Sequence, residues 1–160
     1  MIKRVLIFLI IIIFLGALSV FYPYLTGEKS IKGVEYERET IFVERVIDGD
    51  TLVDQTGVVY RLLGINTPEK GEEYYQEAKD YLSVVNEKQI EVLRDWDDKG
   101  KYGRDLRYIF YEGRLINVEL VEQGLASAYY YEDLVYEGKL LTAEKIAREN
   151  CLMLWEKDCN

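Results

Sequence analysis

The feature that most constrains the fold is a succession of short segments rich in β-branched and apolar residues, separated by turn sequences. Thr40–Val46 and Thr51–Val53 are two such segments, and Val58–Ile65 resumes the pattern after the turn sequence Asp54–Gly57. Segments of this length and composition favour β-strands over helices. Their close spacing along the chain predicts three antiparallel strands joined as a meander.

Alternation of apolar and polar residues indicates two further strands. Ile90 and Val92 flank a polar residue, and Leu106–Phe110 alternates before the turn at Glu112–Gly113. An OB barrel uses five strands of this kind.

Three segments carry apolar residues at helical spacing. They are Glu72–Asn86, Asn117–Gln123, which ends before the helix-terminating Gly124, and Tyr136–Asn150. Together with the strands they predict an α+β fold: a five-stranded OB-fold β-barrel with three helices, preceded by one N-terminal hydrophobic helix.

The N-terminal helix is predicted from an uncharged, mostly apolar run from Val5 to Leu25, which follows two basic residues. The run is long enough to cross a bilayer. Small residues at Ala17 and Ser19 suit signal-peptide cleavage, whereas the bulky residues 21–25 favour an uncleaved anchor. In both cases the preceding basic residues place the rest of the chain outside the cytoplasm.

The chain therefore divides into three parts. Residues 1–25 are a signal peptide or transmembrane anchor, residues 26–38 are a polar linker, and residues 39–160 are the barrel domain. We expect this domain to act as a monomer that is membrane-anchored, or secreted if the first segment is cleaved.

The two cysteines of the chain, Cys151 and Cys159, lie near its C-terminus. Outside the cytoplasm a disulfide between them is expected. Zinc binding is the weaker alternative, because two thiolates without histidine fall short of a zinc ligand set.

The charge composition limits the chemistry. Histidine is absent, which excludes His-centred triads and leaves carboxylates, Arg, Lys and Tyr for catalysis. The 29 acidic and 20 basic residues give a net charge of -9, so the molecule as a whole repels polyanions. A nucleic-acid substrate would need a local basic patch and a bound cation.

Charged and polar residues gather in three separated blocks. These are Asp48–Thr51, then Arg61 with Asn66–Glu69, and finally Lys101–Arg104. They supply oxygen ligands for a hard cation, a carboxylate base and two guanidinium groups, which together suit phosphodiester cleavage.

Each block also has a simpler interpretation. Asp48 and Asp50 occur in a sequence common in ordinary turns, and Arg61 could be a surface arginine. Thr67 could cap a helix whose first residue is Pro68, a local role that could coexist with a functional one.

The blocks, taken in order, resemble the staphylococcal-type thermonuclease family, in which this chain would be a membrane-anchored or secreted member. The family pattern runs Asp-Gly-Asp-Thr, Arg-Leu-Leu, Thr-Pro-Glu and Lys-Tyr-Gly-Arg. The resemblance covers about residues 40 to 156. It implies the same barrel with three helices, and a Ca²⁺-dependent nuclease that cleaves DNA and/or RNA to leave 3′-phosphate ends.

The resemblance also implies a metal site. Asp50, Asn66 and the carbonyl of Thr67 would hold Ca²⁺, and Asp48 would act through a bound water. Many members of the family carry aspartate where this chain has Asn66, so we expect weaker Ca²⁺ binding here.

The remaining roles follow from the same resemblance. Glu69 would be the general base, and Arg61 and Arg104 would stabilise the phosphate in the transition state. Lys101 and Tyr102 would contact a terminal phosphate and the sugar. One tyrosine of Tyr129–Tyr131, best matched by Tyr130, could stack on a base, although core packing is an equal alternative.

Two rival functions remain open. The first is a non-catalytic OB-fold module, tethered to the membrane, that binds nucleic acid. The second is a structural or partner-binding domain in which the same charges form surface salt bridges. In the second case Asp50, Arg61, Glu69 and Arg104 would not converge.

Overall fold

A computed structural model describes residues 37–95, 99–129 and 134–159. The predicted membrane segment 1–25 lies outside these ranges, as does the predicted linker except for its last two residues. Within the described ranges no helix combines the length and apolar character needed to cross a bilayer. All described residues belong to one compact unit, Glu35–Asn160.

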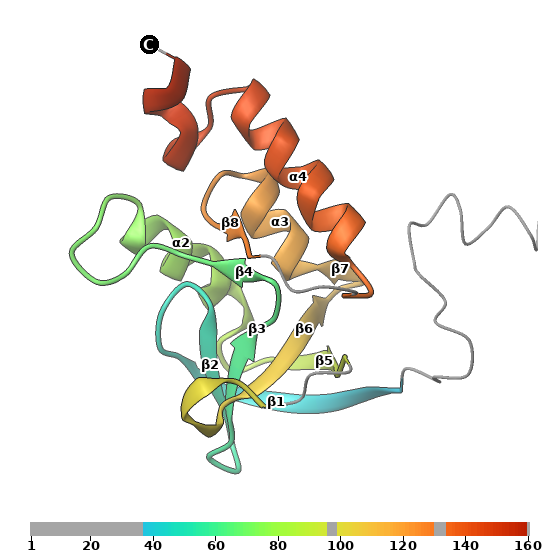
Figure 1. Ribbon diagram of the computed structural model, residues 1–160. Helices are drawn as coiled ribbons and strands as arrows, with labels where there is room; N and C mark the ends of the chain where they lie inside the picture. The colour runs from blue at the N-terminus through green and yellow to red at the C-terminus, as the bar shows by residue number, and fades with distance from the viewer. Residues whose placement is uncertain (1–36, 96–98, 130–133, 160) are drawn as a thin grey trace, which may run out of the picture. The chain divides into compact units, whose positions relative to one another are not determined.

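Five strands form a closed barrel (Figure 1). They are β1 (Arg38–Val46), β2 (Thr51–Asp54), β3 (Val59–Leu62), β5 (Gln89–Leu93) and β6 (Asp105–Tyr111). Neighbours pair in the order β3-β2-β1-β5-β6, and a parallel pairing of β3 with β6 closes the ring. The predicted α+β barrel is therefore confirmed in the part of the chain that the structure describes.

Strand β1 belongs to both halves of the barrel. Its first part, from Arg38 to Phe42, pairs with β5, and its second part, from Val43 to Val46, pairs with β2. The register shifts between Val43 and Arg45. Such a bulge bends a strand and increases its twist, which lets one strand turn the corner between two sheets.

Among the described residues, three α-helices accompany the barrel, as predicted. They are α2 (Tyr75–Leu82), α3 (Ile116–Glu122) and α4 (Glu137–Glu149). Short elements complete the described chain: β4 (Ile65–Asn66), β7 (Arg114–Leu115), β8 (Ser127–Ala128), and the 3₁₀ turns η1 (Ser83–Val85), η2 (Lys101–Gly103) and η3 (Met153–Cys159).

Helix α2 begins later than the sequence predicted. Tyr74, immediately before it, has a left-handed backbone conformation with φ 63°, and the helix starts at Tyr75 instead of Glu72. The alternative role of Thr67 as a helix cap is therefore wrong. The Thr67 hydroxyl instead donates a hydrogen bond to Asp50.

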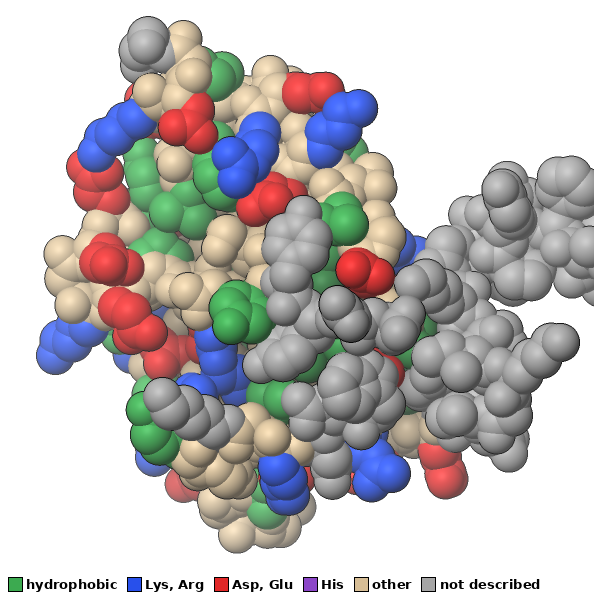
Figure 2. Space-filling view, in the orientation of Figure 1, with side chains coloured by type: hydrophobic (Ala, Val, Ile, Leu, Met, Phe, Trp, Pro, Cys, Tyr) green, Lys and Arg blue, Asp and Glu red, His purple; other side chains and the backbone are tan. Residues whose placement is uncertain are grey.

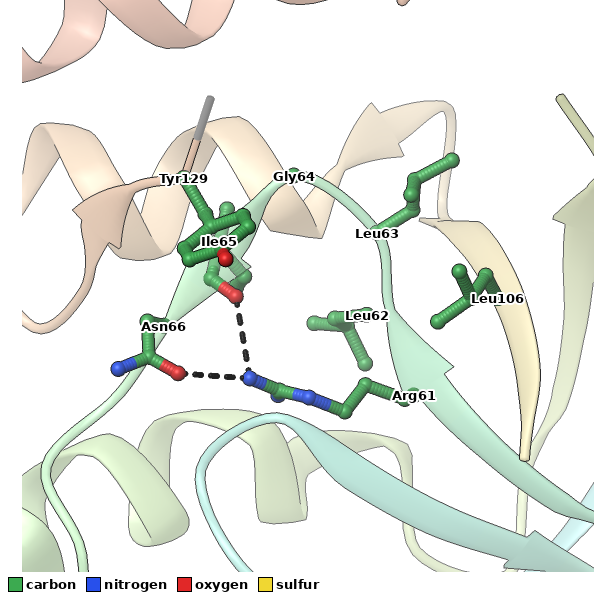
Figure 3. A pocket seen from close by; sticks show the side chains of 8 residues that line it. All are labelled: Arg61, Leu62, Leu63, Gly64, Ile65, Asn66, Leu106 and Tyr129. Atoms are coloured by element: carbon green, nitrogen blue, oxygen red, sulfur yellow. Dashed lines mark hydrogen bonds between the residues drawn. The ribbon is translucent and has the colours of Figure 1, made fainter. Parts of the chain in front are cut away.

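The predicted third strand, Val58–Ile65, is interrupted at Leu63 and Gly64. Gly64 has φ +76°, and a Cβ there would lie 2.6 Å from Cδ1 of Leu140, so both the turn and the packing of α4 require glycine. After the break, β4 pairs with β8 instead of continuing β3. The interruption moves Asn66 out of the barrel strand and turns it toward Arg61 (Figure 3).

Asn117 ties the broken strand to the rest of the fold. Its side chain is fully buried; Oδ1 accepts from the amide of Ile109 at 2.8 Å, and Nδ2 donates to the carbonyl of Leu63 at 2.9 Å. Because a buried amide is costly unless its hydrogen bonds are made, this side chain fixes where β3 ends relative to β6.

Asp54 closes the turn between β2 and β3. Its carboxylate accepts hydrogen bonds from the amide and hydroxyl of Thr56, the amide of Val58 and the hydroxyl of Tyr60, at 2.7 to 3.2 Å. Burial by itself would raise the pKa of Asp54, but these four donors outweigh it and lower the pKa below 3.8.

We expect Asp54→Ala to lower the free energy of unfolding by about 1–3 kcal/mol at neutral pH, because buried donors lose an ionised acceptor. Since the pKa is lowered in the folded state, this contribution is present above pH 3.8 and is lost as the pH falls through the folded pKa. Urea unfolding at pH 7 and at pH 3 measures both effects. An equal difference between wild type and variant at the two pH values would contradict the role of the carboxylate.

Candidate active site

Asp50 is the centre of the candidate site, which lies where the β1–β2 turn meets the segment that follows β4. The residue is only 6 % exposed. Oδ2 accepts from both the amide of Thr67, at 3.1 Å, and the Thr67 hydroxyl, at 2.9 Å. Oδ1 accepts from the hydroxyl of Thr51 at 2.9 Å and forms an ion pair with Arg61. Two segments separated by 17 residues in sequence are thus joined through one carboxylate.

Gly49 is required for this arrangement. A Cβ at this position would lie 2.7 Å from Cβ of Ala78 on α2 and 2.9 Å from Cβ of Thr67. Carbon atoms do not approach this closely, so only glycine lets the turn pack against both neighbours. The glycine between the two aspartates therefore has a packing reason that does not depend on any ligand.

Asp48 stabilises the turn and has a perturbed acidity. Its Oδ1 accepts from the amide of Asp50 at 3.1 Å. The pKa of Asp48 is raised above 3.8, first because burial disfavours the charged form, and second because the Asp50 carboxylate lies nearby. A cation bound beside this pair would favour the charged form of Asp48 and lower its pKa.

Arg61 contacts both side chains predicted to bind metal, Asp50 and Asn66, and Figure 3 shows the contact with Asn66. One terminal nitrogen, Nη1, pairs with Oδ1 of Asp50. The other, Nη2, donates to Oδ1 of Asn66 at 2.7 Å and to the carbonyl of Ile65 at 3.3 Å. Arg61 comes from β3, where it stands opposite Thr51 of β2, so strand pairing brings it to this carboxylate. It is not an isolated surface arginine.

Arg104 directly precedes β6 and has an extended backbone. The parallel pairing of β3 with β6 places Leu106 opposite Arg61, and side-chain alternation directs Arg104 to the face that carries Leu106. Its Nε is shielded from solvent and has no hydrogen-bond partner among the described residues. A buried donor without a partner is uncommon in folded proteins.

Glu69 follows two residues after Thr67 and is exposed. Its amide donates to Oε2 of Glu72 at 2.7 Å, and its carbonyl accepts from the amide of Glu72 at 2.9 Å. The Glu69 carboxylate itself forms no hydrogen bond or ion pair with any described residue. It is therefore free to interact with solvent or with a ligand.

Three predicted substrate-binding residues have different outcomes. Tyr102 is 82 % exposed beside Arg104, whose Cζ lies 5.9 Å from the centre of the Tyr102 ring. Tyr130 and the side chain of Lys101 lie outside what the structure describes. These two predictions stay predictions.

A small pocket of about 90 Å³ adjoins Arg61 (Figure 3). It is lined by Arg61, Leu62, Leu63, Gly64, Ile65, Asn66, Leu106 and Tyr129. Tyr129 is one of the three tyrosines predicted as candidates for base stacking, next to the best-matched Tyr130. Its amide donates to the carbonyl of Gly64 at 2.8 Å, a contact created by the break in the third strand that the sequence argument did not anticipate.

The oxygen atoms around Arg61 suit a cation. Within residues 37–95, 99–129 and 134–159, no three or more Asp, Glu, Cys or His side chains gather as a metal cluster. The predicted site instead depends on the Asp50 carboxylate, the Asn66 amide oxygen and the Thr67 carbonyl. A guanidinium stands between the first two, so these oxygens already converge on a positive charge. The donors are the oxygen types that Ca²⁺ prefers.

The chain was compared with known protein families. The profile of the family described as "Staphylococcal nuclease homologue" matches residues 59–157, more than half of the chain. The chain belongs to this family. The predicted membership is confirmed.

Similarity to individual staphylococcal nuclease homologues extends further along the chain. A thermonuclease of Staphylococcus intermedius is 28% identical over 161 residues, covering 92% of this chain and 96% of the relative. An uncharacterized endonuclease of Haemophilus influenzae is 35% identical over 126 residues (74% and 67%). A thermonuclease of Staphylococcus hyicus is 33% identical over 129 residues (73% and 76%).

The range matched by the staphylococcal nuclease profile begins at Val59. It includes Arg61, Glu69 and Arg104 but not the β1–β2 turn with Asp50. The structure connects that turn to the matched range. Asp50 forms an ion pair with Arg61 and accepts a hydrogen bond from the amide of Thr67, and both partners lie inside the range.

Proposed function

We propose that this staphylococcal nuclease homologue is a Ca²⁺-dependent nuclease that hydrolyses phosphodiester bonds of DNA and/or RNA. The observation that carries the proposal is the convergence of Asp50, Arg61, Asn66 and Thr67 at one place, with the free carboxylate of Glu69 two residues further on. The names thermonuclease and endonuclease among its relatives support the same activity.

The metal would be held by the Asp50 carboxylate, the Asn66 amide oxygen and the Thr67 carbonyl, with Asp48 acting through a water. When bound, Ca²⁺ supplies positive charge that offsets the charge of the phosphate. The negative charge is smaller than two carboxylates would provide, because Asn66 is neutral. This supports binding that is weaker than with aspartate at that position.

The chain's own side chains would perform the hydrolysis. Glu69 accepts a proton from the attacking water, whose oxygen bonds to phosphorus as the bond to the 5′ oxygen breaks. Arg61 and Arg104 donate hydrogen bonds to the phosphoryl oxygens, where negative charge increases in the transition state. The departing 5′ oxygen takes a proton from solvent, so the products are a 3′-phosphate end and a 5′-hydroxyl end.

Substrate binding would use local contacts instead of a broad basic surface. On the face shown in Figure 2, Lys and Arg side chains are interspersed with Asp and Glu side chains. With a net charge of -9, long-range attraction of a polyanion is absent. Lys101 and Tyr102 would hold a terminal phosphate and sugar, and Tyr130 or the pocket residue Tyr129 would stack on a base.

We also place this activity outside the cytoplasm, either anchored by residues 1–25 or released after their cleavage. The disulfide between Cys151 and Cys159 supports this location, because disulfides persist mainly in oxidising compartments.

A nuclease assay on the full chain in mild detergent tests the proposal. Labelled single-stranded DNA, double-stranded DNA and RNA are incubated with Ca²⁺, Mg²⁺, or Ca²⁺ plus excess EGTA. We expect Ca²⁺-dependent release of acid-soluble nucleotides that EGTA abolishes, with product ends that a 3′-phosphatase converts to 3′-hydroxyls. Binding of the strands without cleavage in any metal would overturn the proposal in favour of a non-catalytic module.

A further inference from the structure

The C-terminal segment folds back against the barrel domain and is closed by a disulfide. Cys151 and Cys159, eight positions apart, are bonded across η3. Within this segment the amide of Leu154 donates to the carbonyl of Gly124 at 3.1 Å. A Cβ on Gly124 would lie 2.4 Å from the carbonyl oxygen of Leu152, so the two segments are in close contact. The disulfide therefore closes a loop that is already packed on the domain.

Arg148 holds the same segment to α4. Its guanidinium carbon lies 3.5 Å from the ring centre of Trp155, and its Nη1 lies 3.6 Å from Oδ2 of Asp158. Cation–π stacking and an ion pair of this kind are each weak at an exposed position. The covalent link between Cys151 and Cys159 is the strongest constraint on where η3 lies.

Segment η3 contacts the loop that precedes α2, and Figure 1 shows the two lying near each other. The hydroxyl of Tyr74 donates to Oε2 of Glu156 at 2.7 Å, across 82 residues of sequence. Lys157 forms an ion pair with Glu73. The hydrogen bond to Glu156 also raises the pKa of Tyr74 above 10.0, so the hydroxyl keeps its proton at neutral pH.

The loop contacted by η3 is the one that carries Glu69. One end is fixed where Thr67 bonds to Asp50, and the other where Tyr74 packs against the core and bonds to Glu156. The residues between them, 69–73, are exposed. Exposed backbone with few buried contacts is the part of a fold that opens most readily, so the position of Glu69 depends on both ends.

We propose that the disulfide-closed C-terminal segment, residues 151–159, positions the Glu69 loop through the Tyr74–Glu156 hydrogen bond, and that reduction of the disulfide lowers turnover. The inference rests on the proposed catalytic role of Glu69. Reduction requires two electrons and two protons from a dithiol, which itself becomes a disulfide while Cys151 and Cys159 become thiols. The freed segment then holds Tyr74 less firmly, and Glu69 spends less time in the catalytic position.

Tyr74 is the residue through which the effect is expected to pass. The alternative contact, Lys157 with Glu73, joins side chains that are 76% and 66% exposed, and such pairs contribute little. A hydrogen bond to an ionised carboxylate is stronger and more directional. Tyr74→Phe removes this bond and keeps the ring that packs against the core.

The test measures kcat and KM on single-stranded DNA at saturating Ca²⁺, using the full chain before and after dithiothreitol, with thiols counted. Reduction is expected to lower kcat by about 3- to 30-fold, because small displacements of a catalytic group are costly, while KM changes little. Tyr74→Phe should show a similar loss without reductant, and reduction should add little to it, since residues acting in one chain of contacts are not additive.

Two controls distinguish a loss of kcat that passes through the Tyr74–Glu156 hydrogen bond from a general effect of the reductant or of removing a tyrosine hydroxyl. The double variant Cys151→Ser with Cys159→Ser should have the low kcat and be insensitive to dithiothreitol. Tyr81→Phe removes a comparable tyrosine–carboxylate hydrogen bond, to Glu119 at 3.0 Å on another part of the domain. It should leave kcat and the response to reduction unchanged.

Hydrogen exchange gives a readout that is independent of activity. Reduction should speed amide exchange in residues 69–74 and leave β5 (Gln89–Leu93) unchanged. Three results would each overturn the inference. The first is an equal kcat in both redox states when two thiols are counted after reduction. The others are multiplicative losses of kcat from reduction and Tyr74→Phe, and faster exchange throughout the domain. If the oxidised protein has no nuclease activity, the proposed function fails, and exchange at residues 69–74 alone decides the role of the segment.

Discussion

Replacing Glu69 by glutamine is expected to slow hydrolysis by about 10²- to 10⁴-fold, because the amide cannot accept the proton of the attacking water. The fold should stay intact, since the Glu69 side chain is exposed and bonds to no described residue. Single-turnover cleavage of single-stranded DNA measures the effect, and thermal unfolding verifies the fold.

Glu77→Gln is the matched control for this substitution. Glu77 is an exposed acidic residue in the first turn of α2, outside the site, and its loss changes the net charge by the same amount. Its rate should equal that of the wild type. If Glu69→Gln cleaves at the wild-type rate, Glu69 is not the general base.

Replacing Arg61 by methionine is expected to have two opposite effects. Cleavage should slow by at least about 10²-fold, because a donor to the phosphoryl oxygens is lost. Binding of Ca²⁺ to the substrate-free protein should become about tenfold tighter, because the guanidinium no longer pairs with Asp50 or occupies the oxygen of Asn66. Methionine retains the apolar stem and its packing. Calorimetric titration with Ca²⁺ measures the affinity.

Arg104→Met removes the same charge, and no described contact of Arg104 involves either of these oxygens. It should also slow cleavage but leave Ca²⁺ affinity close to that of the wild type. Unchanged or weaker Ca²⁺ binding by Arg61→Met would show that Arg61 and the metal do not compete for Asp50 and Asn66.

The two expected effects of Arg61→Met have a common physical origin. Arg61 pairs with Asp50, so a cation that binds the Asp50 carboxylate must compete with the guanidinium. The displaced guanidinium then becomes available to a phosphate. Metal binding and phosphate binding are thereby expected to favour each other.

Much of the fold follows from local sequence patterns. Thr40–Val46 forms a strand as predicted from its β-branched and apolar composition, and Leu106–Phe110 forms one as predicted from its alternating sequence. Every residue from Leu106 to Phe110 is buried, so the alternation located this strand although neither face is exposed. The three predicted helices form where apolar residues recur at helical spacing. The start of α2 was misplaced, because nothing in the local sequence requires the left-handed conformation of Tyr74.

The site was predictable in its residue types but not in its contacts. The sequence places Asp50, Arg61 and Glu69 in separate blocks, and a turn motif or a surface arginine explains each block equally well by itself. For Asp50 and Arg61 the structure goes beyond a turn motif and a surface arginine. Strand pairing brings Thr51 opposite Arg61, and a hydrogen bond joins Asp50 to Thr67. Neither contact leaves a signal in the residues next to it in sequence.

Local sequence patterns were enough to predict the kinds of element, their order and the chemical groups available for catalysis. The tertiary structure decided that Gly64 ends β3, that Thr67 bonds to Asp50 instead of capping a helix, and that Arg61 lies between two oxygens. The difference arises because the two kinds of interaction act over different distances along the chain. Periodicity and turn propensity act over a few neighbouring residues, whereas a site is assembled from side chains that meet only after the barrel closes.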